Sequence, residues 1–189
     1  MKKFITLQII LLLMTGIAST AIAESVFMYK KPKVQHPGKE AMPLEAYELI
    51  KKNPVEMIIV DVRTQGEYQF VGHPEGAYLV PFQILGTVFN GKEYEMIENK
   101  NFTRDLMTKF KPNQHTLFFL CRSGSRAAEA LNAAVAAGWP ADRAYVILGG
   151  FEGDKLKDNN SAYNGLRIGG GWRNEGLPWT YSMDSKLVY

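Results

Sequence analysis

Short, uninterrupted apolar runs, separated by stretches of helical periodicity, limit what this chain can fold into more than any other feature. Three such runs cover residues 57–60, 116–120 and 144–148. A continuous apolar run is typical of a strand buried on both faces of a parallel sheet, whereas a strand with one solvated face alternates apolar and polar residues. The runs therefore predict a three-layer α/β fold with a mostly parallel central sheet flanked by helices.

Helical stretches fall between these runs. The spacing of the apolar residues and the positions of proline and glycine predict helices over residues 43–52, 102–110 and 125–137. A shorter apolar run at residues 78–80 predicts a further strand. Residues 82–98 show no clear period and are expected to form a surface excursion.

The two ends of the chain differ from this middle. Residues 24–42 are rich in lysine, proline and glycine, and we expect an extended, solvated lead-in to a globular domain at residues 43–158. Residues 159–189 form a C-terminal extension that contains Trp172 and Trp179. Two indole rings are costly to leave in water together, so we expect them to cover the core or the rim of a site.

Residues 1–23 have the pattern of a secretory signal, with two lysines, an apolar stretch and the small-x-small ending Ala21-Ile22-Ala23. Cleavage there would leave an exported chain, periplasmic in a bacterium, without a membrane span. The alternative is an uncleaved anchor, because residues 4–23 approach the roughly 20 residues that span a bilayer. Polar residues and a glycine inside that stretch favour cleavage.

The charge balance and the cysteine content exclude several functions. The chain has 22 basic and 19 acidic residues, and two of the basic ones lie in the leader, so a mature chain offers no basic surface for nucleic acid. Its single cysteine, Cys121, excludes an internal disulfide, a cysteine-rich zinc site and a CxxC redox pair. His36 and His115 lack the spacing of metal ligands, so we expect no metal and no cofactor.

The loop after the run at residues 116–120 carries the chemistry, with the sequence Cys121-Arg122-Ser123-Gly124-Ser125-Arg126. A strand, a tight loop and a helix start would direct successive backbone N–H groups toward an anion, and Gly124 eases such a turn. With the two arginines, these groups favour thiolate over thiol, so Cys121 is expected to be an exposed nucleophile beside an oxyanion site. Ser123 and Ser125 are expected to donate hydrogen bonds. The alternative is a buried structural cysteine, but a loop with two arginines is not suited to a hydrophobic core.

These residues resemble the active-site loop of single-domain rhodaneses. Further blocks match in order across residues 43–155, namely Asp61-Val62-Arg63 with Glu67-Tyr68, Gly72 to Ala77, and Gly149-Gly150-Phe151. The resemblance implies that Cys121 takes a sulfane sulfur from a donor, releases the remainder, and passes the sulfur from a persulfide to a thiol or protein acceptor, which the sequence does not identify. Arg122 directly after the cysteine resembles the loops that use thiosulfate, a small anionic donor.

Two other functions remain open for this loop. A sulfur-carrier or binding module would accept sulfur for a protein partner without turning over a small donor. A phosphatase or arsenate reductase is less favoured, because those loops resemble a cysteine and an arginine separated by five residues, and here four separate Cys121 from Arg126.

The remaining polar residues have weaker signals. Asp61 and Arg63 are expected to form an ion pair that supports the cysteine loop, as similar positions do in rhodaneses, or Arg63 faces the substrate. His73 lies in a turn rich in glycine and proline and is expected to make a structural hydrogen bond. Glu152 and Asp154 are expected to be solvated loop charges.

Overall fold

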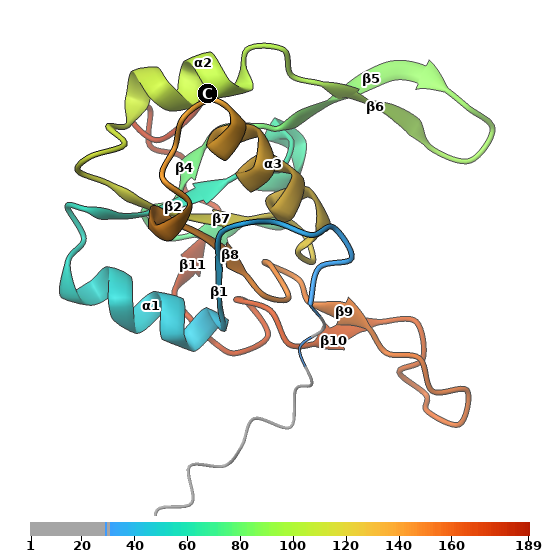
Figure 1. Ribbon diagram of the computed structural model, residues 1–189. Helices are drawn as coiled ribbons and strands as arrows, with labels where there is room; N and C mark the ends of the chain where they lie inside the picture. Colours follow the sequence, from blue (N-terminus) through green and yellow to red (C-terminus); the bar gives the residue numbers. More distant parts are fainter. Residues whose placement is uncertain (1–28, 30) are drawn as a thin grey trace, which may run out of the picture.

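The computed structural model describes residue 29 and residues 31–189, so the predicted leader at residues 1–23 lies outside the described part of the chain. Its centre is a five-stranded sheet with the order β1-β8-β7-β2-β4, in which every pairing is parallel. Helices cover both faces of this sheet (Figure 1), and the predicted α/β architecture is confirmed. The strands of the sheet are β1 (Lys39–Ala41), β2 (Met57–Asp61), β4 (Tyr78–Leu79), β7 (Thr116–Leu120) and β8 (Ala144–Ile147).

The helices and the smaller strand pairs complete the fold. The helices are α1 (Pro43–Lys52), α2 (Phe102–Lys109) and α3 (Ser125–Ala136), with a π-helical turn η1 (Glu67–Val71) and a 3₁₀ turn η2 (Ala141–Arg143). Three antiparallel pairs lie outside the main sheet: β3 (His73–Pro74) with β11 (Trp179–Thr180), β5 (Gln83–Phe89) with β6 (Tyr94–Glu98), and β9 (Asp154–Lys155) with β10 (Arg167–Gly169). No helix of the described residues is both long and apolar enough to cross a bilayer.

Alternate residues of the central strands supply two separate cores, which explains the continuous apolar runs in the sequence. On β7, Leu117 and Phe119 pack in one cluster with side chains from α2 and α3. Phe118 and Leu120 belong to the other cluster, together with residues of α1 and the C-terminal region. Because both faces are buried, β7 is apolar at nearly every position.

The end of the lead-in, at residues 39–41, is not part of the solvated arm that the composition suggested. Residues 39–41 form β1, the edge strand of the sheet, paired in parallel with β8 so that Lys39 faces Tyr145 and Ala41 faces Ile147. Ala41 is buried. A strand of three residues is too short to produce a periodic pattern, and its stability comes from the β8 backbone rather than from its own side chains.

The C-terminal extension is built into the domain. Its strands pair with β3 and β9, and near the chain end the N–H of Leu79 donates to the carbonyl of Leu187 at 2.7 Å. Trp172 is buried in the core cluster on the α1 face, and its Nε1 donates to the carbonyl of Pro178 at 2.8 Å. Trp179 is half-buried against the same cluster. The expectation that both indoles cover the core is confirmed.

The expected surface excursion at residues 82–98 is a β-hairpin that projects away from the sheet (Figure 1). Asn90 begins its turn, donating from its N–H to the carbonyl of Glu93 at 3.1 Å. The strands of the hairpin were not predicted because they do not form buried apolar runs. Several large apolar side chains of the hairpin are exposed: Leu85, Val88, Phe89, Tyr94, Met96 and Ile97.

Candidate active site

The exits of β2, β7 and β8 meet at one edge of the sheet, as the parallel topology predicts. The N–H of Val62, just after β2, donates to the carbonyl of Leu120 at 2.9 Å. The N–H of Phe151, after β8, donates to the carbonyl of Cys121 at 2.8 Å. Three segments far apart in sequence therefore converge on the cysteine.

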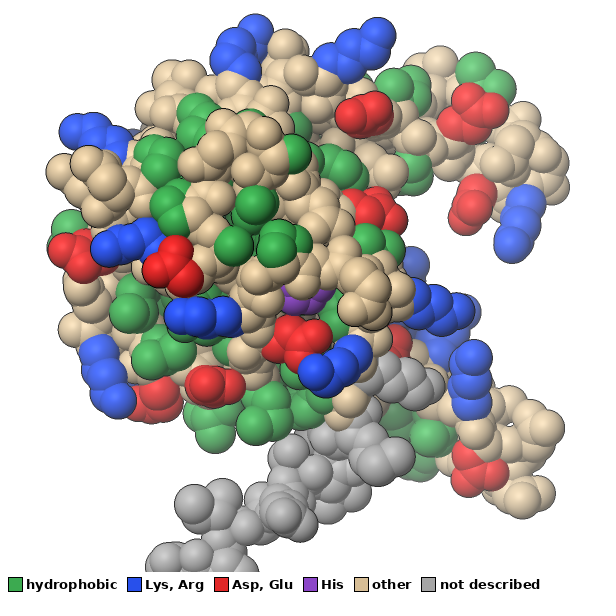
Figure 2. All heavy atoms as spheres, viewed as in Figure 1, with side chains coloured by type: hydrophobic (Ala, Val, Ile, Leu, Met, Phe, Trp, Pro, Cys, Tyr) green, Lys and Arg blue, Asp and Glu red, His purple; other side chains and the backbone are tan. Residues whose placement is uncertain are grey.

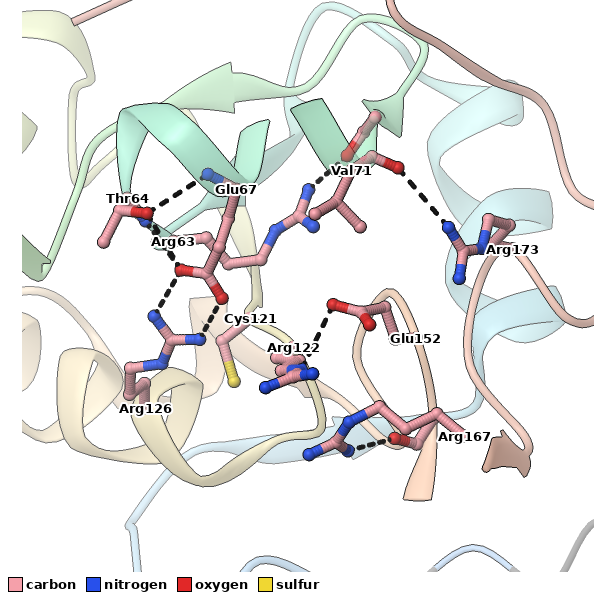
Figure 3. A network of polar contacts seen from close by, with 12 residues as sticks. Arg63, Thr64, Glu67, Val71, Cys121, Arg122, Arg126, Glu152, Arg167 and Arg173 are labelled. Atoms are coloured by element: carbon pink, nitrogen blue, oxygen red, sulfur yellow. Dashed lines mark hydrogen bonds and ion pairs between the residues drawn. The ribbon is translucent and has the colours of Figure 1, made fainter. Parts of the chain in front are cut away.

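Cys121 lies at the amino end of α3, with its sulfur directed into the loop (Figure 3). The N–H of Gly124 donates to Cys121 Sγ at 3.1 Å. Gly124 has a φ of 114°, which other residues rarely adopt, and this angle turns the chain into the helix. The sulfur thus receives a backbone hydrogen bond and lies near the amino end of α3.

Cys121 is more enclosed than expected. Only 2% of its surface is exposed, and it packs with apolar residues of the α2–α3 face, so the expectation of an exposed thiolate is wrong. The physical reason is that the loop begins on a fully buried central strand, and the cysteine continues that strand. The sulfur therefore lies at the floor of the loop.

The turn after β8 holds the cysteine loop in place. Gly150 has a φ of 57°, and a Cβ at this position would overlap the carbonyl oxygen of Cys121 and lie 2.8 Å from the carbonyl carbon of Arg122. The N–H of Glu152 donates to the carbonyl of Arg122 at 3.0 Å. Backbone N–H groups of this turn thus donate to the carbonyls of the cysteine loop, and these hydrogen bonds fix the loop conformation around the sulfur.

Arg126 does not add a free positive charge to the loop. Its two terminal nitrogens donate to both carboxylate oxygens of Glu67, at 2.7 and 2.6 Å. Burial alone would raise the pKa of Glu67, but the Arg126 hydrogen bonds and charge, with the N–H of Thr64, lower it to about 2. The same pair raises the pKa of Arg126 despite its burial. Arg126 is held rigidly beside Cys121, but its charge is largely offset.

Arg122 is also paired with an acid. Its Nε lies 3.3 Å from Glu152 Oε1, and 48% of its side chain is exposed against 11% for Glu152. Glu152 was expected to be a solvated loop charge and is instead buried, because the turn that contacts the loop carbonyls draws its backbone inward. Asp154 is half-buried at the start of β9, so it too departs from that expectation.

The ion pair predicted between Asp61 and Arg63 is present. The Nη2 of Arg63 donates to Asp61 Oδ2 at 2.6 Å and to the carbonyl of Gly72 at 2.7 Å. Both side chains have no exposed surface. The guanidinium thus ties the end of β2 to the turn before β3. Its Nη1 has no hydrogen-bond partner within the described residues, and a contact of Arg63 with a substrate stays a prediction.

His73 makes the structural hydrogen bond expected of it. Its Nδ1 lies 2.9 Å from the carbonyl oxygen of Tyr68, and the two rings stack with centroids 3.5 Å apart. His73 is buried behind η1, away from the cysteine loop.

A groove of about 500 Å³ opens next to the cysteine loop. One wall comes from the β5–β6 hairpin through Leu85 and Met96, and the other includes Glu67, Arg122 and Arg126. In the space-filling view the molecule is hollowed between this hairpin and the β9–β10 arm, and basic side chains gather along the lower side of the hollow (Figure 2). The groove gives a small solute a route toward the loop.

Ser123 and Ser125 flank Gly124 at the start of α3, where they are half-buried and exposed, respectively. No side-chain hydrogen bond from either serine is present within the described residues. Their predicted contacts to substrate oxygens stay a prediction.

Three residues that shape this site were not predicted from the sequence. Glu67 lies in a segment that resembles rhodaneses, but the sequence analysis assigned no role to it. Its position three residues after Thr64 is typical of a carboxylate that accepts from a nearby backbone N–H. Arg167 and Asn174 come from the C-terminal extension, and only the tertiary fold brings them to the loop.

The described residues contain no group of three or more histidine, cysteine or acidic side chains that could hold a metal ion.

The site therefore consists of a lone cysteine at the amino end of a helix, beside arginines paired with glutamates, at the carboxyl ends of a parallel sheet. The chain belongs to the rhodanese-like domain family, whose model matches residues 42–157. Members of this family are, in general, sulfurtransferase-like.

Relatives with similar sequence cover most of the chain. The crystal structure of Rv0390 from M. tuberculosis is 32% identical, with a TM-score of 0.59, and the match covers 78% of this chain and 100% of that one. The uncharacterized protein RP600 of Rickettsia prowazekii is 32% identical over 140 residues, which are 72% of this chain and 93% of the relative. A homologue from Rickettsia rickettsii is 30% identical over 138 residues.

Proposed function

We propose that this protein is a sulfurtransferase that moves a sulfane sulfur from a thiosulfate-like donor to a thiophilic acceptor through a Cys121 persulfide. The observation that carries the proposal is the hydrogen bond from the Gly124 N–H to Cys121 Sγ at the amino end of α3. A thiolate is the nucleophile in such a reaction, and a backbone N–H is the kind of donor that a thiolate sulfur accepts from.

The reaction requires one sulfur nucleophile and no second cysteine. The Cys121 thiolate attacks the outer sulfur of thiosulfate, an S–S bond forms, and the S–S bond of the donor breaks with its electron pair leaving on sulfite. The enzyme then carries a persulfide anion. An acceptor such as cyanide attacks the outer sulfur, leaves as thiocyanate, and the Cys121 thiolate returns.

Charge near the sulfur supports an anionic donor. Arg122 is half-exposed at the mouth of the loop, so its remaining N–H groups are accessible to a solute. The first-turn N–H groups of α3 are not used by the helix itself and can donate to donor oxygens or to the terminal persulfide sulfur. Both contacts strengthen as negative charge shifts toward the outer sulfur and the leaving sulfite.

A carrier that loads once for a protein partner would share this chemistry and differ in turnover. The assay supplies thiosulfate and cyanide as the only reactants and counts thiocyanate formed per protein molecule. We expect many equivalents from the wild type and none from Cys121→Ser. A single equivalent from the wild type would overturn catalytic turnover and favour the carrier.

Export is a further part of the proposal, based on the sequence of residues 1–23. An exported enzyme would meet acceptors different from the thiols of the cytosol. The N-terminal residue of protein recovered from a bacterial periplasm tests it: Glu24 is expected at the start, and retention of Met1 would contradict cleavage.

A further inference from the structure

Arg167 belongs to the C-terminal extension, beyond the residues that the family model matches, and contacts the segment after β8 that lies against the cysteine loop. It lies on β10, and its Nη1 donates to the carbonyl of Gly153 at 2.7 Å. Figure 3 shows its guanidinium on the same side of the site as Arg122. The hydrogen bond fixes one end of the guanidinium and leaves its other N–H groups available.

The segment that carries Arg167 is fixed to the turn that holds the cysteine loop. The N–H of Trp172 donates to the carbonyl of Gly150 at 2.8 Å. The side-chain amide of Asn174 donates to the carbonyl of Glu152 at 2.9 Å and to that of Arg167 at 3.2 Å. Arg167 is therefore held at a set position relative to Cys121 by backbone and amide contacts.

Arg167 has a buried hydrogen-bond donor that the fold does not use. Its Nε is buried and has no hydrogen-bond partner within the described residues. Burial and the charge of Arg122 lower the pKa of Arg167, and the charges of Glu152 and Asp154 oppose this shift without cancelling it. Two guanidinium groups near each other, with unused donors, are stabilised by an anion that accepts from both.

The two arginines of the cysteine loop are both paired with carboxylates. Arg126 is committed to both oxygens of Glu67, and the Nε of Arg122 is paired with Glu152. A doubly negative donor needs more positive charge than these pairs leave free. Arg167 is a further basic side chain whose charge acts on both Arg122 and Cys121.

We propose that Arg167 is a donor-binding residue, which acts with Arg122 to hold the sulfonate oxygens of a thiosulfate-like dianion while its outer sulfur meets Cys121. The inference rests on the proposed function for the identity of the donor. It makes the C-terminal extension part of the substrate site rather than a support for the core alone.

The test measures the dissociation constant of thiosulfate by calorimetry in a Cys121→Ser background, where binding occurs without transfer. Adding Arg167→Gln is expected to raise the Kd about tenfold, the effect of losing a charge-assisted hydrogen bond. The matched control is Lys157→Met, which removes an exposed charge from the loop after β9 and is expected to change the Kd less than about twofold. An equal Kd with and without Arg167→Gln, or no binding by the background protein, would overturn the proposal.

Two further measurements separate a binding role from a structural one. Arg167→Lys restores the charge, so it is expected to recover most of the affinity that Arg167→Gln loses, at the same melting temperature. Cyanide discharge of an already loaded persulfide needs no sulfonate contact and should keep its rate in Arg167→Gln. A slowed discharge, or a Kd for Arg167→Lys as weak as that for Gln, would contradict donor binding. Sulfur loading of the wild type tests the proposed function separately, because the Kd is measured without transfer.

Discussion

At the scale of single residues, the site depends on how each charge is paired. Asp61 neutralises Arg63 in full burial, Glu67 binds Arg126 through two hydrogen bonds, and Glu152 approaches Arg122. The sequence predicted the first of these pairs. The other two join segments 59 and 30 residues apart, which no local spacing reveals.

The Glu67–Arg126 pair makes a pH-dependent contribution to stability. The pKa of Glu67 is lowered from 4.5 to about 2, so its contribution is complete above about pH 4.5 and is lost as the pH falls toward 2. Glu67→Gln is expected to lower the free energy of unfolding at pH 7 by about 2 kcal/mol, since it leaves a half-buried arginine with a weaker partner. Urea denaturation at pH 7 and pH 3 measures this, and the difference between the two proteins should shrink at pH 3.

The control for this substitution is Glu93→Gln, which removes an exposed carboxylate from the same groove. Its stability should stay within about 0.5 kcal/mol of the wild type. An undiminished effect of Glu67→Gln at pH 3 would contradict the assigned ion pair.

At the scale of elements, the contact between the turn after β8 and the cysteine loop decides the geometry of the sulfur. The run at residues 144–148 predicted the strand, and the glycines after it marked a turn. The strands, the three helices and the convergence of strand ends followed from apolar runs and helix-ending residues. β1 and the β5–β6 hairpin did not, because one is three residues long and the other exposes its apolar side chains.

Gly150→Ala tests that contact. Its Cβ would overlap the Cys121 carbonyl, so we expect a loss of about 3 kcal/mol in the free energy of unfolding and a persulfide loading rate at least tenfold lower. Gly76→Ala is the matched control, because Gly76 also has a positive φ, 76°, but a Cβ there meets nothing within 4 Å. Gly76→Ala should lower the free energy of unfolding by about 1 kcal/mol and leave the rate of persulfide loading unchanged. Equal loading rates in the two variants would show that the close approach is not needed.

At the scale of the whole molecule, the C-terminal extension closes the fold and reaches the site. Trp172 fills the core on the α1 face, β10 and β11 pair with earlier strands, and Arg167 lies at the loop. Composition alone predicted that the tryptophans would be buried. It could not predict which strands the extension would join, because that depends on contacts between residues distant in sequence.

Glu175 links the extension to α1 and gives the whole fold a second pH dependence. Burial raises its pKa from 4.5 to about 7, opposed by a hydrogen bond from the backbone of Leu44. The native state therefore retains a proton that the unfolded chain releases, and stability should fall as the pH rises from about 4.5 to 7. Because the carboxyl is partly solvated, the expected loss is about 1 kcal/mol.

Thermal unfolding between pH 5 and pH 8 checks this expectation with Glu175→Gln. The variant should lose the decline across this range and be the more stable protein at pH 8. A wild type whose stability rises over the same range, or a variant with an unchanged decline, would assign the dependence to another group.

The central claim is that Cys121 accepts and carries a sulfur atom, and intact-protein mass spectrometry after exposure to thiosulfate tests it most directly. The wild type is expected to gain the mass of one sulfur atom and to lose it on treatment with cyanide, while Cys121→Ser gains nothing. An unchanged wild-type mass, or an equal gain in Cys121→Ser, would contradict the claim.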